Sequence, residues 1–180
     1  MSLDSLDAQV DTLRQEAATS SANFAREAKT ITSNSNLSDE GKAAAKAEVN
    51  KQAKDHLRSL SRKETEAINM KVRDLERQLD AKAGSTASDI IAFRDAQDRA
   101  ERFDQSEDAV KALERALRTE DNVLAHAIFR RGMEANWRDV LATFGNAYPE
   151  KKSIVSELTY LREAQRNTLA RGMSYMWVNQ

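Results

Sequence analysis

The stretch that decides the fold runs from residue 38 to residue 82 and reads SDEGKAAAKAEVNKQAKDHLRSLSRKETEAINMKVRDLERQLDAK. It contains no proline, and its only glycine, Gly41, falls in the first turn. Ser38 is a favourable N-cap, and Asp39 and Glu40 place negative charge at the positive end of the helix dipole. We therefore predict one long, uninterrupted and mostly polar helix over about 38–82.

A narrow apolar seam follows this helix. Leu57, Ile68 and Leu79 are eleven residues apart, and an eleven-residue repeat keeps a seam on one side of a nearly straight helix. The remaining members of the seam are Val49, Leu60, Val72 and Leu75. At about 1.5 Å per residue the helix is roughly 60–70 Å long, which is too long for a compact core. The seam needs a partner helix, from its own chain or from another copy.

A second helix, with a heptad pattern, precedes the long one. Its apolar and small residues alternate at steps of three and four over 3–31, as in a coiled coil; they include Leu3, Leu6, Val10, Leu13, Ala17, Ser20, Phe24 and Ile31. The polar run 30–36 ends this helix because short polar side chains compete for backbone hydrogen bonds. We interpret residues 1–83 as an extended helical arm, in which the first helix either folds onto the long helix or pairs with another chain.

The arm predicts self-association. Its two seams have no other apolar surface of matching length in the chain to pack against, so we expect a homo-oligomer. The residues assigned to this contact are Leu3, Leu6, Val10, Leu13, Leu57, Ile68 and Leu79.

The C-terminal half holds most of the large apolar side chains. Both tryptophans, all three tyrosines and four of the five phenylalanines lie after residue 90. Short segments with helical spacing predict a small bundle over 84–172. One proline and five glycines leave few places for tight hairpins, and 32% charged residues are typical of exposed helices. The predicted fold is therefore all-α, with an extended N-terminal coiled-coil arm and a small C-terminal helical bundle.

The last eight residues, 173–180, form an aromatic C-terminal tail. Met173, Tyr175, Met176 and Trp177 are residue types favoured at the centres of interfaces. Arg162, Arg166 and Arg171 precede the tail and would attract an acidic partner. We predict that these seven residues bind a partner protein. The alternative is that the tail folds back and completes the bundle.

The sequence carries no recognisable catalytic or metal-binding pattern. There is no cysteine, and the two histidines, His56 and His126, lie on separate predicted helices without a second ligand at helical spacing. No Ser-His-Asp arrangement or glycine-rich phosphate loop is present. We therefore expect a non-enzymatic protein without cofactors.

Nucleic acid and membrane are the other partners to consider. The net charge is −1, and no apolar run reaches transmembrane length. One alternative is a packaging or regulatory protein that contacts phosphates with the basic face of 42–82, which carries Lys42, Lys46, Lys51, Lys54, Arg58 and Arg62. Acidic residues interrupt that face and no aromatic residues are interleaved, so we expect neither nucleic acid nor membrane as a partner. A helical adaptor or chaperone is a further alternative.

Two stretches resemble small helical proteins of tailed phages. The first is Asn36-Leu-Ser-Asp-Glu-Gly-Lys42, which leads into a helix rich in Ala, Lys and Glu. The second runs from Ala125 to Leu141, AHAIFRRGMEANWRDVL, and is followed by Tyr148-Pro149-Glu150. These stretches are similar to proteins of actinobacterial phages and prophages that are encoded near the major capsid protein.

The resemblance implies a scaffolding-type or capsid-associated virion-assembly protein. It implies extended helices for self-association and a terminal segment that binds the coat, here the tail with Trp177 together with Arg162, Arg166 and Arg171. It carries no catalytic residues. It places the protein in the cytoplasm of a bacterial host during assembly, and leaves open whether the protein is retained in the virion.

Overall fold

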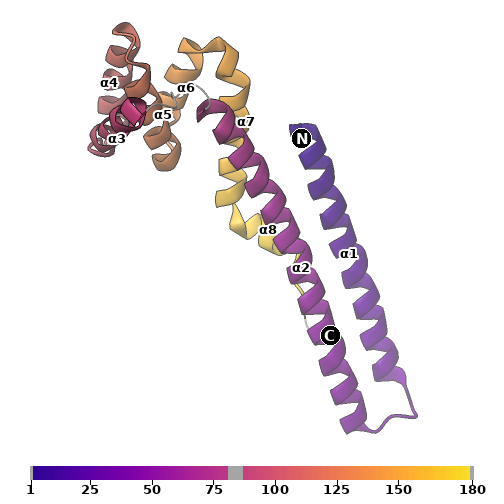
Figure 1. The fold of residues 1–180 in the computed structure, drawn as a ribbon. Helices are drawn as coiled ribbons and strands as arrows, with labels where there is room; N and C mark the ends of the chain where they lie inside the picture. The colour runs from indigo at the N-terminus through magenta and orange to yellow at the C-terminus, as the bar shows by residue number, and fades with distance from the viewer. Residues whose placement is uncertain (1, 81–86, 179–180) are drawn as a thin grey trace. The chain divides into compact units, whose positions relative to one another are not determined.

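The computed structural model describes residues 2–80 and 87–178 (Figure 1). Across these two ranges every regular element is helical and no strand occurs, which confirms the predicted all-α class. The elements are α1 Leu3–Ser33, α2 Asp39–Asp80, α3 Ala87–Glu101, α4 Ser106–Arg118, α5 Asn122–Ala135, α6 Arg138–Ala147, the 3₁₀ helix η1 Pro149–Lys151, α7 Lys152–Arg166 and α8 Thr168–Ser174. The last two residues of the predicted helix 38–82 and the predicted boundary between arm and bundle at 83–84 lie outside the described residues.

The chain divides into two compact units. The first unit comprises residues 1–72 and 161–180, and the second comprises residues 73–160. This division differs from the predicted one, an arm over 1–83, a bundle over 84–172 and a separate tail over 173–180. The C-terminal residues belong with the N-terminal helices because, as shown below, their buried polar groups find partners on α1 and α2.

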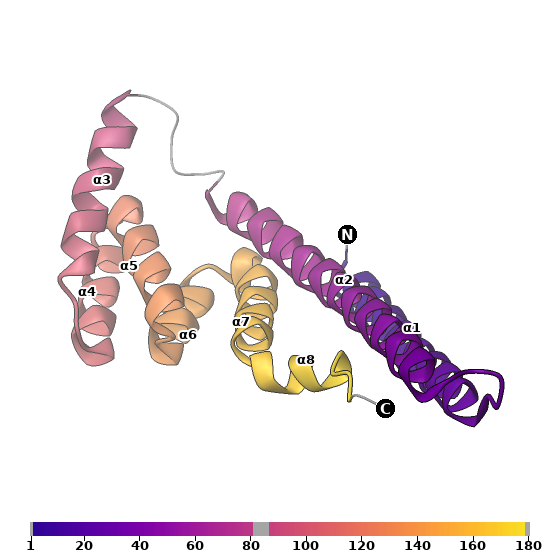
Figure 2. The ribbon, with the colours of Figure 1, turned by 90° about the horizontal axis from the view of Figure 1, so that it is seen from below.

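The core of the first unit is an antiparallel hairpin of α1 and α2, which lie side by side in Figures 1 and 2. The N-cap of α1 is Ser2, whose hydroxyl accepts a hydrogen bond from the amide of Ser5 at 3.2 Å. In the loop, the Asn34 side chain accepts from the amide of Asn36 at 2.9 Å. The Ser38 hydroxyl accepts from the amide of Gly41 at 3.1 Å, as the predicted N-cap of the long helix requires.

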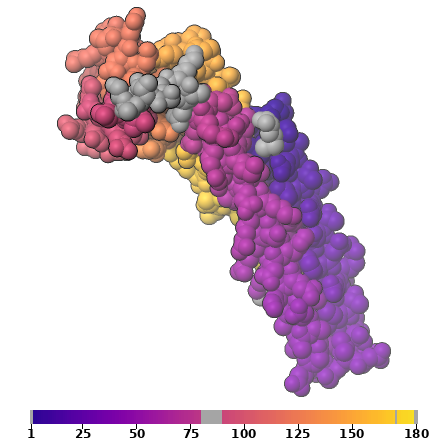
Figure 3. All heavy atoms as spheres, viewed as in Figure 1, coloured from indigo at the N-terminus to yellow at the C-terminus, as the bar shows by residue number. Residues whose placement is uncertain are grey.

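The apolar seams of α1 and α2 are buried in the folded chain. Leu13, Ala17, Leu57 and Leu60 form one cluster in the hairpin. Leu6, Val10, Val49, Ile68 and Val72 are buried as well. The atoms of the two helices meet along the hairpin in the space-filling view (Figure 3). The sequence left two pairings open, and the structure shows the one in which the first helix folds onto the long helix.

The second unit is built around α5. Helices α3, α4 and α6 all contact α5, and α4 also contacts α6. The rings of Phe129 on α5 and Phe144 on α6 stack with centroids 4.2 Å apart. Leu113, Ile128 and Val140 are completely buried in the same unit. Burial of these apolar side chains is the main source of the bundle's stability.

The turn between α5 and α6 brings the two helices unusually close. Asn136 adopts the left-handed conformation with φ 60°, and the amide of Trp137 donates to the carbonyl of Gly132 at 2.9 Å. This is the Schellman arrangement, in which an asparagine can replace the usual glycine. A Cβ atom on Gly132 would lie 2.6 Å from Cγ1 of Val140. Gly132 is therefore required by helix packing.

Among the described residues, no helix is both long enough and apolar enough to cross a membrane.

We predict that Gly132→Ala destabilises the second unit by about 1–3 kcal/mol, because the added methyl group overlaps a β-branched neighbour with little freedom to move. Denaturant unfolding followed by circular dichroism measures the loss. Gly145→Ala is the matched control: its Cβ would meet the nearest side-chain atom at 3.9 Å, so the better helix propensity of alanine should leave stability equal or higher. Equal stability of the two variants would contradict the packing argument.

Candidate functional site

The candidate site is the C-terminal segment, which we define as residues 168–178. It comprises α8 and the four residues after it, and it packs on α1 and α2. The preceding helix is attached to α2 by a hydrogen bond from Gln165 Nε2 to Asn69 Oδ1 of 2.7 Å. The segment therefore has an inner face toward the hairpin and an outer face toward solvent.

A buried carboxylate holds the inner face. Glu64 on α2 is 0% exposed. Its Oε1 accepts from Arg14 Nη2 at 2.8 Å, and its Oε2 accepts from Arg14 Nε at 3.2 Å. The hydroxyl of Tyr175 donates to the same Oε2 at 2.5 Å. An unpaired buried carboxylate is very costly, so these three hydrogen bonds tie α1, α2 and the C-terminal segment to one another.

The same contacts shift the pKa values of both partners of Glu64. The pKa of the Arg14 guanidinium is raised, mainly by its hydrogen bond to Glu64 and against the effect of burial. The pKa of the Tyr175 phenol is raised strongly, first by burial and then by the hydrogen bond to Glu64 and its negative charge. Arg14 is therefore charged and Tyr175 is neutral throughout the physiological range.

Trp177 is the second anchor of the inner face. Its indole Nε1 donates to Oδ1 of Asn50 on α2 at 2.8 Å. Its ring lies edge-on to Phe24 of α1 with centroids 6.2 Å apart. Tyr175 and Trp177 both pack on the Leu13 cluster of the hairpin. In the structure both side chains lie against the chain's own helices, as in the alternative that the tail folds back, because each polar group has an acceptor there. Their predicted binding to a partner stays a prediction.

The outer face carries exposed apolar side chains. Leu169 and Met173 are 79% and 66% exposed, and Met176 and Val178 are exposed to a similar degree. Leu169 and Met173 are four residues apart on α8, which places them on one side of that helix, and Met176 follows just after the helix end. Large exposed apolar side chains that lie together mark interaction sites more often than the rest of a surface. The methionines of the predicted partner site are thus exposed, whereas Tyr175 is buried and Trp177 is half-buried.

The three predicted arginines have different environments. Arg166 is exposed at the end of α7, and Arg171 is half-buried on α8. Arg162 is also half-buried, and its Nη1 donates to Gln165 Oε1 at 3.4 Å. Arg166 therefore adds exposed positive charge just before the C-terminal segment.

The residues predicted for self-association are largely buried within one chain. Leu6, Val10, Leu13, Leu57, Ile68 and Leu79 are buried, and Leu3 is half-buried. The premise that these seams have no apolar surface in their own chain was wrong, because the hairpin supplies it. Association of copies remains a prediction, and it needs a different surface.

The polar cluster around His56 does not have the geometry of a catalytic triad. His56 Nε2 lies 3.1 Å from Ser20 Oγ and 3.9 Å from Glu16 Oε1. In a triad the carboxylate contacts the other ring nitrogen and so orients the base toward the nucleophile. Within residues 2–80 and 87–178, no group of three His, Asp or Glu side chains is placed to hold a metal ion.

His126 belongs to a partly exposed polar cluster of the second unit. Its Nδ1 lies 2.7 Å from the carbonyl oxygen of Asn122, and its Nε2 lies 2.6 Å from Nζ of Lys151. The carbonyl can only accept, so Nδ1 carries the proton and Nε2 accepts from the lysine. The hydroxyl of Tyr148 donates to Oδ1 of Asn122 at 2.7 Å in the same cluster.

Comparison of the chain with models of protein families, with curated proteins and with solved structures finds no match.

Sequence reasoning missed the residues that hold the site together, Glu64, Arg14 and Asn50. One signal for Glu64 was present. It lies seven residues after Leu57 and four before Ile68, so it interrupts the apolar seam with a charge. A charged residue at a seam position predicts a buried partner of opposite charge. The identity of that partner cannot be read from spacing, because Arg14 is 50 residues away.

We predict that Arg14→Met costs about 3 kcal/mol of unfolding free energy, because it leaves the buried Glu64 carboxylate without its cation. Tyr175→Phe should cost about 1.5–3 kcal/mol through loss of a hydrogen bond to a charged acceptor. Arg58→Met is the control, since Arg58 pairs with Asp55 at 3.9 Å on an exposed surface and such pairs contribute less than about 1 kcal/mol. Denaturant unfolding measures all three. An Arg14 variant as stable as the Arg58 variant would contradict the assigned role of Glu64.

The raised pKa of Tyr175 predicts a stability loss at high pH. A group whose pKa is higher in the folded state contributes full stability below its ordinary pKa, here 10.0, and loses that contribution as the pH rises through the raised value. Unfolding free energy should therefore fall above pH 10 in the wild type and fall less in Tyr175→Phe. Absorbance of tyrosinate at alkaline pH gives a second readout, because Tyr175→Phe should remove a late-titrating phenol. Loss of a phenol that titrates near its ordinary pKa of 10.0 instead would show that Tyr175 is not buried against Glu64.

Proposed function

We propose that this chain is a non-enzymatic helical assembly protein that binds a partner protein through the outer face of its C-terminal segment. The observation that carries the proposal is the two-sided character of this segment. Its inner face is attached to the hairpin through Tyr175 and Trp177, while its outer face leaves Leu169, Met173 and Met176 exposed. A segment held in place before binding loses little conformational entropy when a partner docks on it, which favours affinity.

The partner best supported is a coat protein of a tailed phage. The support is the resemblance of residues 36–42 and 125–150 to virion-assembly proteins encoded near the major capsid protein. The exposed positive charge of Arg166, just before this segment, suits an acidic surface with an apolar centre, since charges at the rim of an interface steer association. In this proposal the protein acts as a scaffolding-type or capsid-associated protein in the bacterial cytoplasm.

Point substitutions on the outer face test this role better than truncation. Deletion of 173–180 would also remove Tyr175 and Trp177, so it would destabilise the hairpin and confuse two effects. Met173→Ser combined with Met176→Ser alters only exposed side chains and leaves the inner face intact. Met70→Ser is the matched control, because Met70 on α2 has the same 66% exposure as Met173.

We predict that the double methionine variant loses at least about tenfold in affinity for the major capsid protein of the phage or prophage that carries this chain, as expected for residues at an interface centre. Affinity is measured with the purified proteins at low and moderate salt, and melting temperatures are compared in parallel. The Met70 variant should bind like the wild type. Normal binding by the double variant would refute the proposed site.

The salt series separates the alternative functions. A contact dominated by apolar side chains should change little with salt, whereas a protein that binds nucleic acid through the basic face of α2 loses affinity steeply as salt rises. Tight binding to nucleic acid with that salt dependence, and none to the coat protein, would favour the packaging or regulatory role.

A further inference from the structure

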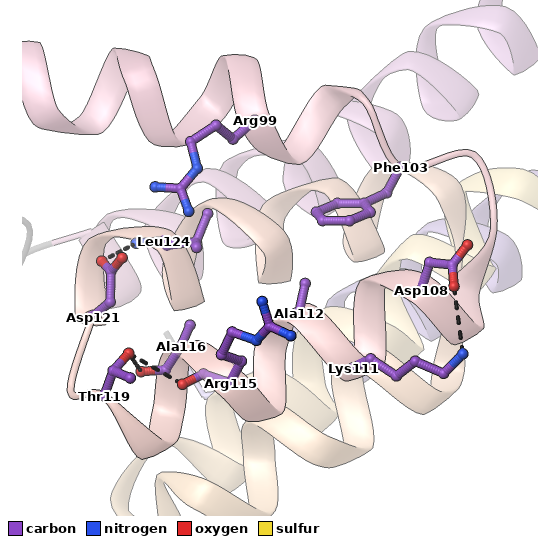
Figure 4. Close-up of a pocket in the computed structure, with 10 residues that line it drawn as sticks. All are labelled: Arg99, Phe103, Asp108, Lys111, Ala112, Arg115, Ala116, Thr119, Asp121 and Leu124. Carbon is purple, nitrogen blue, oxygen red and sulfur yellow. Dashed lines mark hydrogen bonds and ion pairs between the residues drawn. The ribbon is translucent and has the colours of Figure 1, made fainter.

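A hollow of about 400 Å³ opens between α3, α4 and α5 of the second unit (Figure 4). Its floor is apolar: Leu124 and Ala116 are buried, and Phe103 and Ala112 are half-buried. The volume falls at the lower end of the range of ligand-binding clefts. Because the removal of apolar surface from water is favourable, this floor favours an apolar group.

The rim of the hollow is basic. Arg99 in the last turn of α3, and Lys111 and Arg115 on α4, line the hollow and are exposed. Figure 4 shows the Arg99 side chain reaching from α3 and the Arg115 side chain reaching from α4, both directed toward the space between the two helices. Two guanidinium groups directed at one space over an apolar floor leave a position for an anion between them.

The two acidic groups of the hollow already have partners. Asp121 accepts a hydrogen bond from the amide of Leu124 at 3.0 Å and so serves as the N-cap of α5. Asp108 lies 3.5 Å from Nζ of Lys111 and offsets the charge of that lysine. The positive charge that remains at the rim therefore belongs to the arginines.

The guanidinium groups of Arg99 and Arg115 have little to bind in their own chain. Arg99 makes only a long contact with Asp95 of the same helix, at 4.0 Å. Within residues 2–80 and 87–178, the Arg115 side chain forms no hydrogen bond or ion pair. A guanidinium group binds a carboxylate through two parallel N–H···O bonds, so a carboxylate is the anion that these side chains match best.

An acidic peptide with one large apolar side chain matches both parts of the hollow. Its apolar side chain would contact Phe103 and Leu124, and carboxylates on either side of it would meet Arg99 and Arg115. Salt weakens the attraction between exposed arginines and a small free anion, whereas a peptide adds burial of an apolar group. Single-stranded nucleic acid fits less well, because one half-buried aromatic ring is no platform for successive bases.

We propose that the hollow between α3, α4 and α5 binds an acidic segment of a partner protein. One large apolar side chain of the segment enters the hollow, and Arg99 and Arg115 bind the neighbouring carboxylates. Because so small a contact buries little surface, we expect a dissociation constant on the order of 100 μM for an isolated peptide. The proposal does not rest on the coat-binding role, since the hollow shares no residue with the C-terminal segment.

A defined peptide tests the site on the full-length protein. The probe is an N-acetylated and C-amidated pentapeptide with a central phenylalanine and two glutamates on each side of it. Titration of the ¹⁵N-labelled protein, followed by amide chemical shifts up to millimolar peptide, measures the affinity. Replacing the phenylalanine by alanine, or the glutamates by glutamines, should each weaken binding at least about tenfold, because the apolar and the charged groups both contribute.

Substitutions on α4 provide a matched pair. Arg115→Gln should weaken peptide binding at least about tenfold through loss of its contact with a carboxylate. Arg118→Gln should bind like the wild type, because Arg118 is also exposed in the last turn of α4 but does not line the hollow. Both variants remove one positive charge, so a general electrostatic attraction would affect them equally. Circular dichroism should show an unchanged fold in both.

Filling the floor tests the apolar part of the site. Ala112→Leu places a larger side chain in the hollow without changing the charge of the rim, so it should weaken binding of the phenylalanine peptide at least about tenfold. The melting temperature of this variant, compared with that of the wild type, shows whether the fold is kept.

Four results would overturn the proposal. The first two are no binding of the peptide at millimolar concentration, and equal losses in Arg115→Gln and Arg118→Gln. The others are unchanged binding in a folded Ala112→Leu variant, and binding of a single-stranded oligonucleotide that depends on Arg115 in place of the peptide. All four concern the second unit, so they leave the methionine test of the coat-binding role unaffected.

Discussion

The interaction on which the first unit depends is the buried Glu64 carboxylate with Arg14 and Tyr175. A charge inside an apolar seam is stable only if every strong hydrogen-bonding position has a partner. Here the partners come from α1 and from the C-terminal segment, so satisfying one carboxylate aligns three parts of the chain. Apolar contacts between Leu13, Leu57 and Leu60 tolerate sliding of one helix along the other. The ion pair of Glu64 with Arg14 does not tolerate such sliding, and it therefore sets the register of α1 along α2.

The same principle gives the C-terminal segment its two faces. Tyr175 and Trp177 have large apolar rings with one polar atom each, and both polar atoms find acceptors on α2, at Glu64 and Asn50. Because Tyr175 and Trp177 pack on the hairpin, Met173 and Met176 lie on the solvent-exposed face. A flexible, polarisable methionine surface on a fixed support adapts readily to a partner. Helix α3 has a comparable division, because Ala96 and Ala100 are buried while Ile91 and Asp95 face solvent.

The second unit is held together by close packing of helices, whereas the first unit depends on a buried ion pair. Its α5–α6 corner depends on Gly132, whose missing side chain lets Val140 approach, and on Asn136 in the left-handed conformation. The stacked rings of Phe129 and Phe144 complete the same contact. His126 and Lys151 form a hydrogen bond beside these rings, so this polar contact adds to the packing of the corner.

The sequence by itself determined the helical class, the extent of the first two helices to within a few residues, and the apolar seams. These depend on propensity, capping and periodicity, which act over a few turns of one helix. Only the tertiary structure decided which surfaces those seams cover. Tyr175 and Trp177 look alike in sequence whether they bind another protein or their own chain, because the pattern does not say which acceptor is nearby. Tyr175 and Glu64 are more than a hundred residues apart in the sequence, and so are Trp177 and Asn50. Contacts at that separation arise from the arrangement of helices, which local sequence does not encode.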